Sequence, residues 1–246
     1  MLDPSKIASR VVLDPMYQIR KESMNVVRRL VDLDDKKKML IEFFDNKIEV
    51  VFKTIEAVVA KGASFEQTLN YVVGLNAGEY DSVLLAWKEK VRHDLVRPTT
   101  NIRNYMSDER FVTWGGPHHN GTKIIDGKNF EAYLRVMPHS EYVSGSACIC
   151  QSIYEFTDLW ISENLDIQDS VEVSLMFAAG SSKIAPGFTP ASDINMKLNN
   201  MQELRDKCGK SRLDGGMHFT QSVPAGYKLC EGVGTAAFDY SKELYG

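Results

Sequence analysis

The chain has 246 residues, of which 43% are hydrophobic and 25% are charged, a profile typical of a globular protein that buries a core. The formal net charge is −4 and the basic residues are spread along the sequence, which argues against nucleic acid as the main partner. No apolar run is long enough to span a bilayer, and the first residues lack the pattern of a signal peptide. We therefore expect a soluble protein. Because no linker rich in Pro, Gly or Ser divides residues 1–246, we also expect a single domain.

Helical periodicity dominates the first hundred residues. Apolar residues between 34 and 61 recur at a spacing of three to four, which predicts one long amphipathic helix. A capping box of Ser64 and Gln67 predicts a second helix. A third is expected from about 79 to 92, because Pro98 stops the pattern.

The rest of the chain alternates between loops and helices. Residues 114–127, which include His118 and His119, have no clear period and predict a long ordered loop. Helices are expected over 146–160, over 191–208 and from about 224 past 238, with a short strand at 171–177. The predicted fold class is therefore mostly α, a helical bundle with long irregular loops.

The four cysteines are Cys148, Cys150, Cys208 and Cys230, and their spacing fits no zinc site. Cys148 and Cys150 lie two apart in a predicted helix, so they point in different directions. The sequence favours the interpretation that they are small buried hydrophobic side chains. It leaves the cellular compartment open.

Two segments of the chain offer cations or N–H groups that suit an anion. Lys90 and Arg97 lie seven residues apart at a helix end, where two cations can project from neighbouring turns. For such a pair taken alone, a solvated charged face is the more common explanation. The second segment, Ser144-Gly145-Ser146, directly precedes an apolar helix, whose unpaired N–H groups and dipole favour an anion. An ordinary serine N-cap is the alternative explanation of this turn.

The third segment adds Arg212 and His218 beside two glycines that allow a close backbone approach. A lone histidine of this kind is more often a core residue than a metal ligand. The three segments together supply three cations, a helix N-terminus and one imidazole. This set suits a tetrahedral oxyanion with an axial nitrogen ligand.

The three segments resemble the motifs of the vanadium-dependent haloperoxidases, which share a fold and an anion site with the type 2 phosphatidic acid phosphatases and the bacterial acid phosphatases. The matching residues are Lys90 and Arg97-Pro98 for the first motif, Val143-Ser144-Gly145-Ser146 in part for the second, and Ser211-Arg212 and His218 for the third. The likeness covers residues 38–234. Family members are commonly much longer, so the chain looks like the catalytic C-terminal part of one, without an N-terminal helical half.

The resemblance implies a vanadate cofactor, vanadium(V), and the roles of the site residues. Lys90, Arg97 and Arg212 would bind vanadate oxygens, Ser144 and the Gly145 N–H would hydrogen-bond to it, and His218 would ligate vanadium. Lys90 would also polarise hydrogen peroxide for attack by a halide, giving a hypohalous-acid equivalent. The implied partners are hydrogen peroxide, a halide and an organic acceptor.

Two positions depart from the family pattern. Ser146 stands where the family has an acid–base histidine, and a hydroxyl does not titrate near neutrality. The local candidates for proton transfer are then His93, His139 and Lys90. The second departure follows His218, where the family's second-shell acid is replaced by Ser222 or Val223. The candidates to replace that acid are Asp214 and Asp45.

The halide and the reaction stay open at this point. His139 matches a histidine of the algal bromoperoxidases, which favours bromide or iodide, whereas a turn cap after Pro138 is the alternative. An acid phosphatase with His218 as its nucleophile is a second candidate function, disfavoured by Ser146. The third is a non-catalytic oxyanion-binding protein. A homodimer or a longer parent chain would cover the apolar helix faces expected if a helical half is missing.

Overall fold

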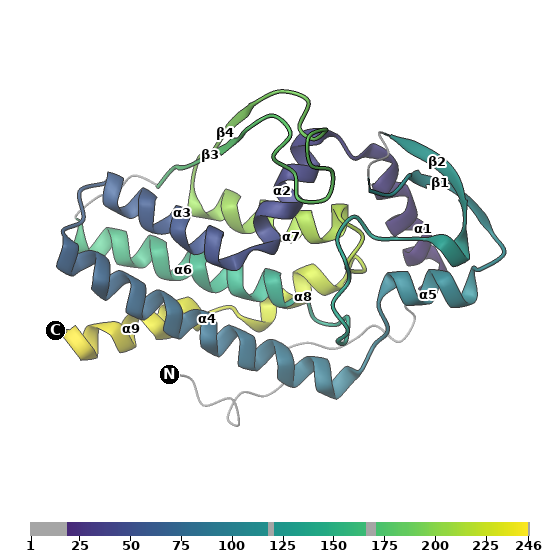
Figure 1. The fold of residues 1–246 in the computed structure, drawn as a ribbon. Helices are drawn as coiled ribbons and strands as arrows, with labels where there is room; N and C mark the ends of the chain where they lie inside the picture. The colour runs from purple at the N-terminus through teal and green to yellow at the C-terminus, as the bar shows by residue number, and fades with distance from the viewer. Residues whose placement is uncertain (1–18, 118–120, 166–170, 246) are drawn as a thin grey trace.

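The computed structural model describes residues 19–117, 121–165 and 171–245, so His118 and His119 lie outside the described residues (Figure 1). The elements are α1 (Ile19–Arg29), a 3-10 turn (Leu30–Asp32), α2 (Asp35–Asp45), α3 (Lys47–Ala60), α4 (Phe65–His93), α5 (Pro98–Tyr105), β1 (Arg110–Trp114), β2 (Thr122–Asp126), a second 3-10 turn (Gly127–Asn129), α6 (Gly145–Asn164), β3 (Val173–Phe177), β4 (Ile194–Leu198), α7 (Met201–Asp214), α8 (Ser222–Leu229) and α9 (Val233–Tyr245). The mostly α class expected from the sequence is confirmed.

The helix predicted over 34–61 is broken in two at Asn46. The Asn46 backbone is extended, with φ −89° and ψ 92°, and its side chain accepts a hydrogen bond from the Glu49 N–H. Asn46 therefore ends α2 and caps α3, because a short amide side chain competes with the helical hydrogen bonds. The single-helix prediction was wrong at this one position, which the apolar periodicity does not reveal.

α4 joins two helices that the sequence predicted separately. The capping box of Ser64 and Gln67 is present, and the helix then runs unbroken to His93. Gly74 and Gly78 lie within it where it meets α6: an added Cβ would come within 2.6 Å of the Phe156 ring or of Ser152 Oγ. The glycines thus permit close packing instead of ending the helix.

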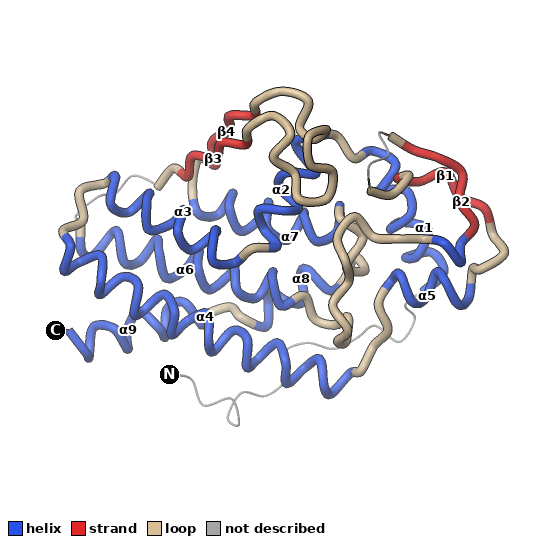
Figure 2. Tube along the Cα trace, in the orientation of Figure 1, coloured by secondary structure: helices blue, strands red, loops and turns tan. Residues whose placement is uncertain are grey.

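Two antiparallel hairpins lie at the upper edge of the bundle (Figure 2). β1 pairs with β2 and β3 pairs with β4. The predicted loop over 114–127 was wrong from 122 to 126, where the chain forms β2. The helix predicted over 191–208 was wrong in its first half, because side chains over Ile194–Leu198 alternate with a period of two; α7 begins only after Asn200, whose side chain caps it.

The bundle itself is built by α3, α4, α6, α7 and α9, which lie side by side in Figure 1. Its core contains a cluster of aromatic rings, with ring centroids 5.1 Å apart for Tyr71 and Trp160 and 6.3 Å apart for Phe156 and Phe238. The single helix predicted from about 224 past 238 is in fact two helices, because Gly232 turns the chain at φ 85° between α8 and α9.

Among the described residues, none of the helices combines the length and the apolar character needed to cross a membrane.

The cysteines are buried as expected, but they are paired, which corrects the interpretation as simple hydrophobic side chains. Cys148 bonds to Cys230 and Cys150 to Cys208, with Cα atoms 5.1 and 6.5 Å apart. Since residues two apart in α6 point in different directions, each reaches a different neighbour. The disulfides tie α6 to α7 and to the turn that follows α8.

Candidate oxyanion site

A cavity of about 300 Å³ lies where α4, α6 and α7 come together. Of the site residues that the sequence predicted, the ones that line the cavity are Lys90, Arg97, His139, Gly145, Ser146, Arg212 and His218. Ser144 lies directly behind the wall, fully buried. Residues from three distant segments are therefore brought together around one space.

Arg97 lies at the centre of the hydrogen-bond network around this cavity. Its Nη1 donates to the Met217 carbonyl oxygen at 3.0 Å and to His218 Nε2 at 3.1 Å, and its Nε donates to the His139 carbonyl oxygen at 3.0 Å. Arg97 is the residue before Pro98, so the start of α5 fixes its position. Burial lowers the pKa of Arg97 to about 10, which leaves the guanidinium charged at neutral pH.

Lys90 lies in the last turn of α4 and is buried. Its ammonium donates to the carbonyl oxygens of Ser140 and Glu141, at 2.8 and 3.2 Å. Burial and then the nearby charge of Arg97 lower the pKa of Lys90 to about 7. Near neutrality this lysine can therefore both hold and release a proton.

His218 is neutral and has one nitrogen fixed. Its Nδ1 lies 2.8 Å from Glu141 Oε1, and its Nε2 accepts from Arg97, so the network assigns the proton to Nδ1. Burial lowers the pKa of His218 to about 3. Nε2 is thus the unprotonated nitrogen and meets Arg97 at the cavity wall; a metal ligated there would take the place of the Arg97 N–H as its partner.

The carboxylate that supports His218 is Glu141, not one of the two aspartates proposed from the sequence. Asp45 pairs with Arg212, and Asp214 pairs with Lys210. Both expectations for the second shell were therefore wrong, because each aspartate is taken by a basic partner.

Glu141 is buried and fully occupied by donors. Its Oε1 also accepts from the Phe219 N–H at 3.0 Å, and its Oε2 accepts from the Ser222 hydroxyl at 2.7 Å. Although burial acts to raise its pKa, the hydrogen bonds from His218, Ser222 and Phe219 hold the pKa of Glu141 below its ordinary value. Ser222, which stands where the family acid was expected, thus contributes through Glu141.

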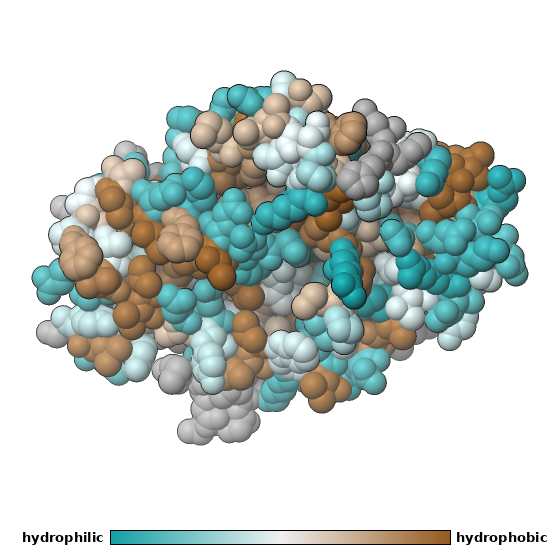
Figure 3. Space-filling view, in the orientation of Figure 1, coloured by the Kyte–Doolittle hydropathy of each residue, from teal (hydrophilic) through white to brown (hydrophobic). Residues whose placement is uncertain are grey.

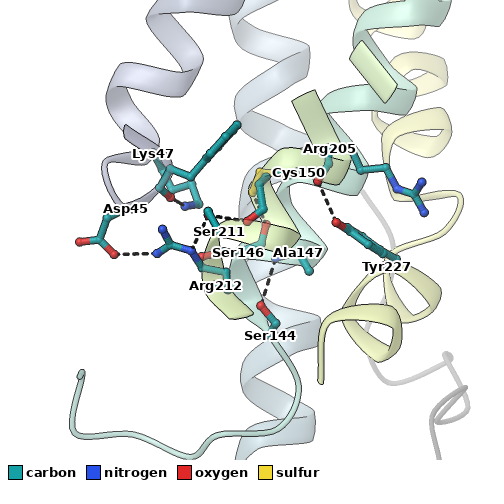
Figure 4. Close-up of a disulfide and its surroundings, with 12 residues drawn as sticks. Asp45, Lys47, Ser144, Ser146, Ala147, Cys150, Arg205, Ser211, Arg212 and Tyr227 are labelled. Atoms are coloured by element: carbon teal, nitrogen blue, oxygen red, sulfur yellow. Dashed lines mark hydrogen bonds and ion pairs between the residues drawn. A yellow bond between two sulfur atoms is a disulfide. The ribbon is translucent and has the colours of Figure 1, made fainter. Parts of the chain in front are cut away.

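The turn before α6 acts both as an N-cap and as a set of anion donors. Ser144 Oγ accepts from the Ala147 N–H at 3.3 Å, so the ordinary N-cap is observed (Figure 4). Its own hydroxyl proton stays available for an acceptor. A Cβ added at Gly145 would lie 3.8 Å from Ala86 Cβ and 3.9 Å from Lys90 Cε, which is ordinary contact. Gly145 itself lines the cavity, so its backbone borders the space in which a ligand would bind.

Arg212 reaches the cavity from α7. Its Nη1 lies 2.9 Å from Asp45 Oδ1, and its Nη2 donates to the Ile41 carbonyl oxygen at 2.6 Å (Figure 4). Burial lowers the pKa of Arg212, opposed by Asp45. Arg212 is buried and Asp45 is exposed, and both line the cavity, so the ion pair links the cavity wall to the protein surface.

Lys47 is a cavity-lining residue that the sequence analysis did not assign. It begins α3, points toward Arg212 in Figure 4 and donates to the Phe44 carbonyl oxygen. Burial and then Arg212 lower the pKa of Lys47 to about 7, against the opposing charges of Asp45 and Glu79. No spacing in the sequence relates Lys47 to the three motifs, so the sequence did not mark it as a site residue.

The candidates for proton transfer separate into two groups. His139 lines the cavity: its ring lies 5.0 Å from that of Trp87 between centroids, and its Nδ1 is 3.2 Å from Arg97 Nη2. His93 does not line it, because its ring packs edge-on against Tyr142. Lys90 and His139 therefore remain at the cavity, and His93 does not.

These residues fit a tetrahedral oxyanion better than a bare metal cation. Four buried or half-buried basic side chains and the Gly145 N–H lie around the unprotonated Nε2 of His218. Within the part of the chain that the structure describes, no group of three His, Cys, Asp or Glu side chains could hold a metal ion by itself. A metal that arrives as an oxyanion matches this donor set.

Comparison with known proteins shows which family model and which solved structures this chain resembles. The family model described as the VCPO second helical-bundle domain, VCPO denoting vanadium chloroperoxidase, matches residues 70–246. The crystal structure of a bacterial vanadium-dependent chloroperoxidase in its holo form is 24% identical at a TM-score of 0.85, covering 92% of this chain and 48% of that one. The crystal structure of the apo form is 24% identical at a TM-score of 0.86, and the match covers 99% of this chain and 54% of that one.

A bacterial vanadium-dependent iodoperoxidase is also similar, with 17% identity, a TM-score of 0.64, and coverage of 94% of this chain and 52% of the other. None of the curated protein sequences matches. At these identities the likeness shows the fold, and the chain spans about half the length of the three solved relatives.

Proposed function

Because the chain belongs to the vanadium chloroperoxidase family, we propose that it is a vanadate-dependent haloperoxidase that oxidises halide with hydrogen peroxide. The observation that carries the proposal is the convergence of Lys90, Arg97 and Arg212 on a neutral His218. When bound, vanadate would supply a Lewis acid that activates hydrogen peroxide for attack by halide.

Each group of the chain has a distinct part in this proposal. The three cations would hold the vanadate oxygens, the Ser144 hydroxyl and the Gly145 N–H would donate to them, and His218 Nε2 would ligate vanadium. Glu141 keeps the His218 proton on Nδ1 and so keeps Nε2 available. Fixed positive charge around a developing oxyanion lowers the barrier without reorganisation during the reaction.

Proton transfer is assigned to lysine, because Ser146 cannot titrate near neutrality. Lys90 and Lys47 both line the cavity, and burial lowers the pKa of each to about 7. A group with a pKa near the working pH is an effective general acid or base. The hydroxyl of Ser146 can relay a proton between them but cannot hold it.

Bromide or iodide is the proposed halide, on the basis of His139. The matched structures include both chloroperoxidases and an iodoperoxidase, so the fold does not choose between halides. His139 contacts Arg97 and Trp87 at the cavity. We expect His139→Phe, which removes the ring nitrogens that contact Arg97, to raise the ratio of chloride to bromide turnover.

An organic acceptor would bind in a neighbouring cavity of about 870 Å³. Its wall includes Trp114, Tyr133 and Leu134, and it shares Val136 and Met137 with the oxyanion cavity. An apolar acceptor there would lie beside the site of halide oxidation. Val136→Trp should reduce turnover of bulky phenols while leaving iodide oxidation to triiodide unchanged; an equal loss of both rates would contradict this binding site.

The test of the proposed function uses the full chain with orthovanadate, hydrogen peroxide, bromide or iodide, and a phenolic dye. We expect halogenated dye, its loss in His218→Ala, and its retention in the matched control His93→Ala. Melting temperature with and without orthovanadate provides a readout besides activity, because a ligand that binds the folded state raises it. Release of p-nitrophenol from its phosphate without vanadium would favour a phosphatase, and vanadate binding without turnover would favour a binding protein.

A further inference from the structure

α4 carries a continuous row of apolar side chains on its solvent side. The exposed members, spaced by three, four or seven residues, are Phe65, Leu69, Val73, Tyr80, Leu84, Trp87 and Val91. That spacing places them on one helix face over nearly the whole length of α4. The opposite face of α4 is buried in the bundle, where it packs against α6 and α9.

α3 extends this row into a surface. Ile48, Phe52 and Val59 are 69%, 59% and 48% exposed. In Figure 3 hydrophobic side chains gather over α3 and α4, in the left half of the view. Single exposed apolar residues are normal, but a contiguous apolar patch marks an interaction surface. We name this set of α3 and α4 side chains the α3–α4 face.

We propose that the α3–α4 face binds the same face of a second copy of this chain, with the two α4 helices antiparallel. The charges at the ends of the row favour this pairing. Glu66 near the start of α4 and Arg92 near its end are both exposed and stand equally far from the helix midpoint. An antiparallel arrangement brings Glu66 of one copy opposite Arg92 of the other, whereas a parallel one opposes like charges.

The same two-fold arrangement also matches the apolar positions. Leu69 would lie within two residues of the level of Trp87 of the second copy, Val73 within one residue of the level of Leu84, and Tyr80 one residue from the axis. The order of small and large side chains along α4 is therefore self-complementary, as an isologous interface requires.

The interface would reach the oxyanion cavity. Val83 and Trp87 line that cavity and are 38% and 46% exposed on α4. A second copy seated on α4 would close this side of the wall. The inference itself does not depend on vanadate chemistry, so it can be tested without any ligand.

The first test is the solution mass of the full chain by light scattering and sedimentation equilibrium. We expect twice the 27.7 kDa of one chain, and a monomer for Leu84→Arg with unchanged helical circular dichroism. Met176→Arg is the matched control, because Met176 is 77% exposed on β3, outside the α3–α4 face. A monomeric parent chain, or a dimer that Leu84→Arg leaves intact, would overturn the proposal.

A charge exchange tests the antiparallel geometry. Arg92→Glu should raise the dimer dissociation constant at least about tenfold, because like charges then face each other. Adding Glu66→Arg to Arg92→Glu should restore the dimer to within about threefold of the parent chain. In a parallel pair each position faces its own copy, so like charges oppose one another in the parent chain and in both variants. A dissociation constant that Arg92→Glu leaves unchanged would therefore reject the arrangement proposed here.

Discussion

His218 Nδ1 lies 2.8 Å from Glu141 Oε1, and this contact decides which nitrogen of the imidazole faces the cavity. Without it, the proton could sit on either nitrogen, and Nε2 would be a donor in part of the population. Two further donors, the Phe219 N–H and the Ser222 hydroxyl, hold the carboxylate in place. A residue from the loop before α6 therefore determines which ring nitrogen of His218 carries the proton.

Replacement of Glu141 by Gln should weaken orthovanadate binding by about 10- to 100-fold, the usual effect of losing an outer-shell carboxylate. The amide can accept from Nδ1–H, but it no longer stabilises charge on the imidazole when the metal is bound. Isothermal titration with orthovanadate measures the change. Glu131→Gln serves as the control, since Glu131 is exposed; equal affinities for the two variants would contradict the assigned role.

Gly145→Ala should leave the fold intact and reduce oxyanion affinity. The added methyl group meets only ordinary contacts, at 3.8 and 3.9 Å, so the melting temperature without ligand should stay within about 2 °C of the parent value. The stabilisation that orthovanadate gives should fall, because the methyl group occupies space in front of the helix N-terminus. An unchanged stabilisation would place the anion elsewhere.

Oxyanion affinity should fall as pH rises from about 6 to 8. The pKa values of Lys90 and Lys47 are both lowered to about 7, so both side chains lose their positive charge as pH passes this value. Bound anion raises these pKa values and moves the fall to higher pH. Sulfate is the probe, because it does not itself titrate in this range.

The matched variants separate the two lysines. Arginine stays charged throughout, so Lys90→Arg and Lys47→Arg should each remove part of the pH dependence, and the double variant should remove most of it. A sulfate affinity in the parent chain that is constant between pH 6 and 8 would show that neither lysine titrates there.

The disulfide between Cys150 and Cys208 should contribute about 2–5 kcal/mol to the free energy of unfolding, the common effect of a native bridge. Cys208 lies one helical turn before Arg212, so loss of the bridge also loosens the helix that carries this cation. Urea unfolding of the double serine variant measures the effect, with the Cys148 and Cys230 double serine variant as comparison. If reductant leaves the urea midpoint of the parent chain unchanged, the bridges do not stabilise the fold.

Much of the site could be predicted from the sequence because its residues lie at helix ends. Helix ends have strong local signals: Pro98 fixes the start of α5 after Arg97, and the capping serine Ser144 fixes the start of α6. The spacing of Arg212 and His218 spans the end of α7. Local chemistry therefore determined which side chains could converge.

The parts that were missed depend on contacts between distant segments. Glu141 lies 77 residues from His218, and no pattern in the sequence marks their contact. Lys47 depends in the same way on how α3 lies beside α7, and the two disulfides depend on how α6 packs against α7 and the turn after α8. Ile194–Leu198 was misread for another reason: a run of five residues is too short for its period to distinguish a strand from a helix.

The paired cysteines also bear on the protein's resistance to its own product. Under the proposed function the chain releases a strong oxidant of thiols and thioethers. All four cysteines are already joined, so no thiol is left for that oxidant to consume. The most accessible sulfur near its source is then Met137, which is 62% exposed and lines both cavities. Self-inactivation during turnover would therefore begin with oxidation of Met137 to its sulfoxide at the cavity wall, while the two disulfides continue to hold the helical bundle together.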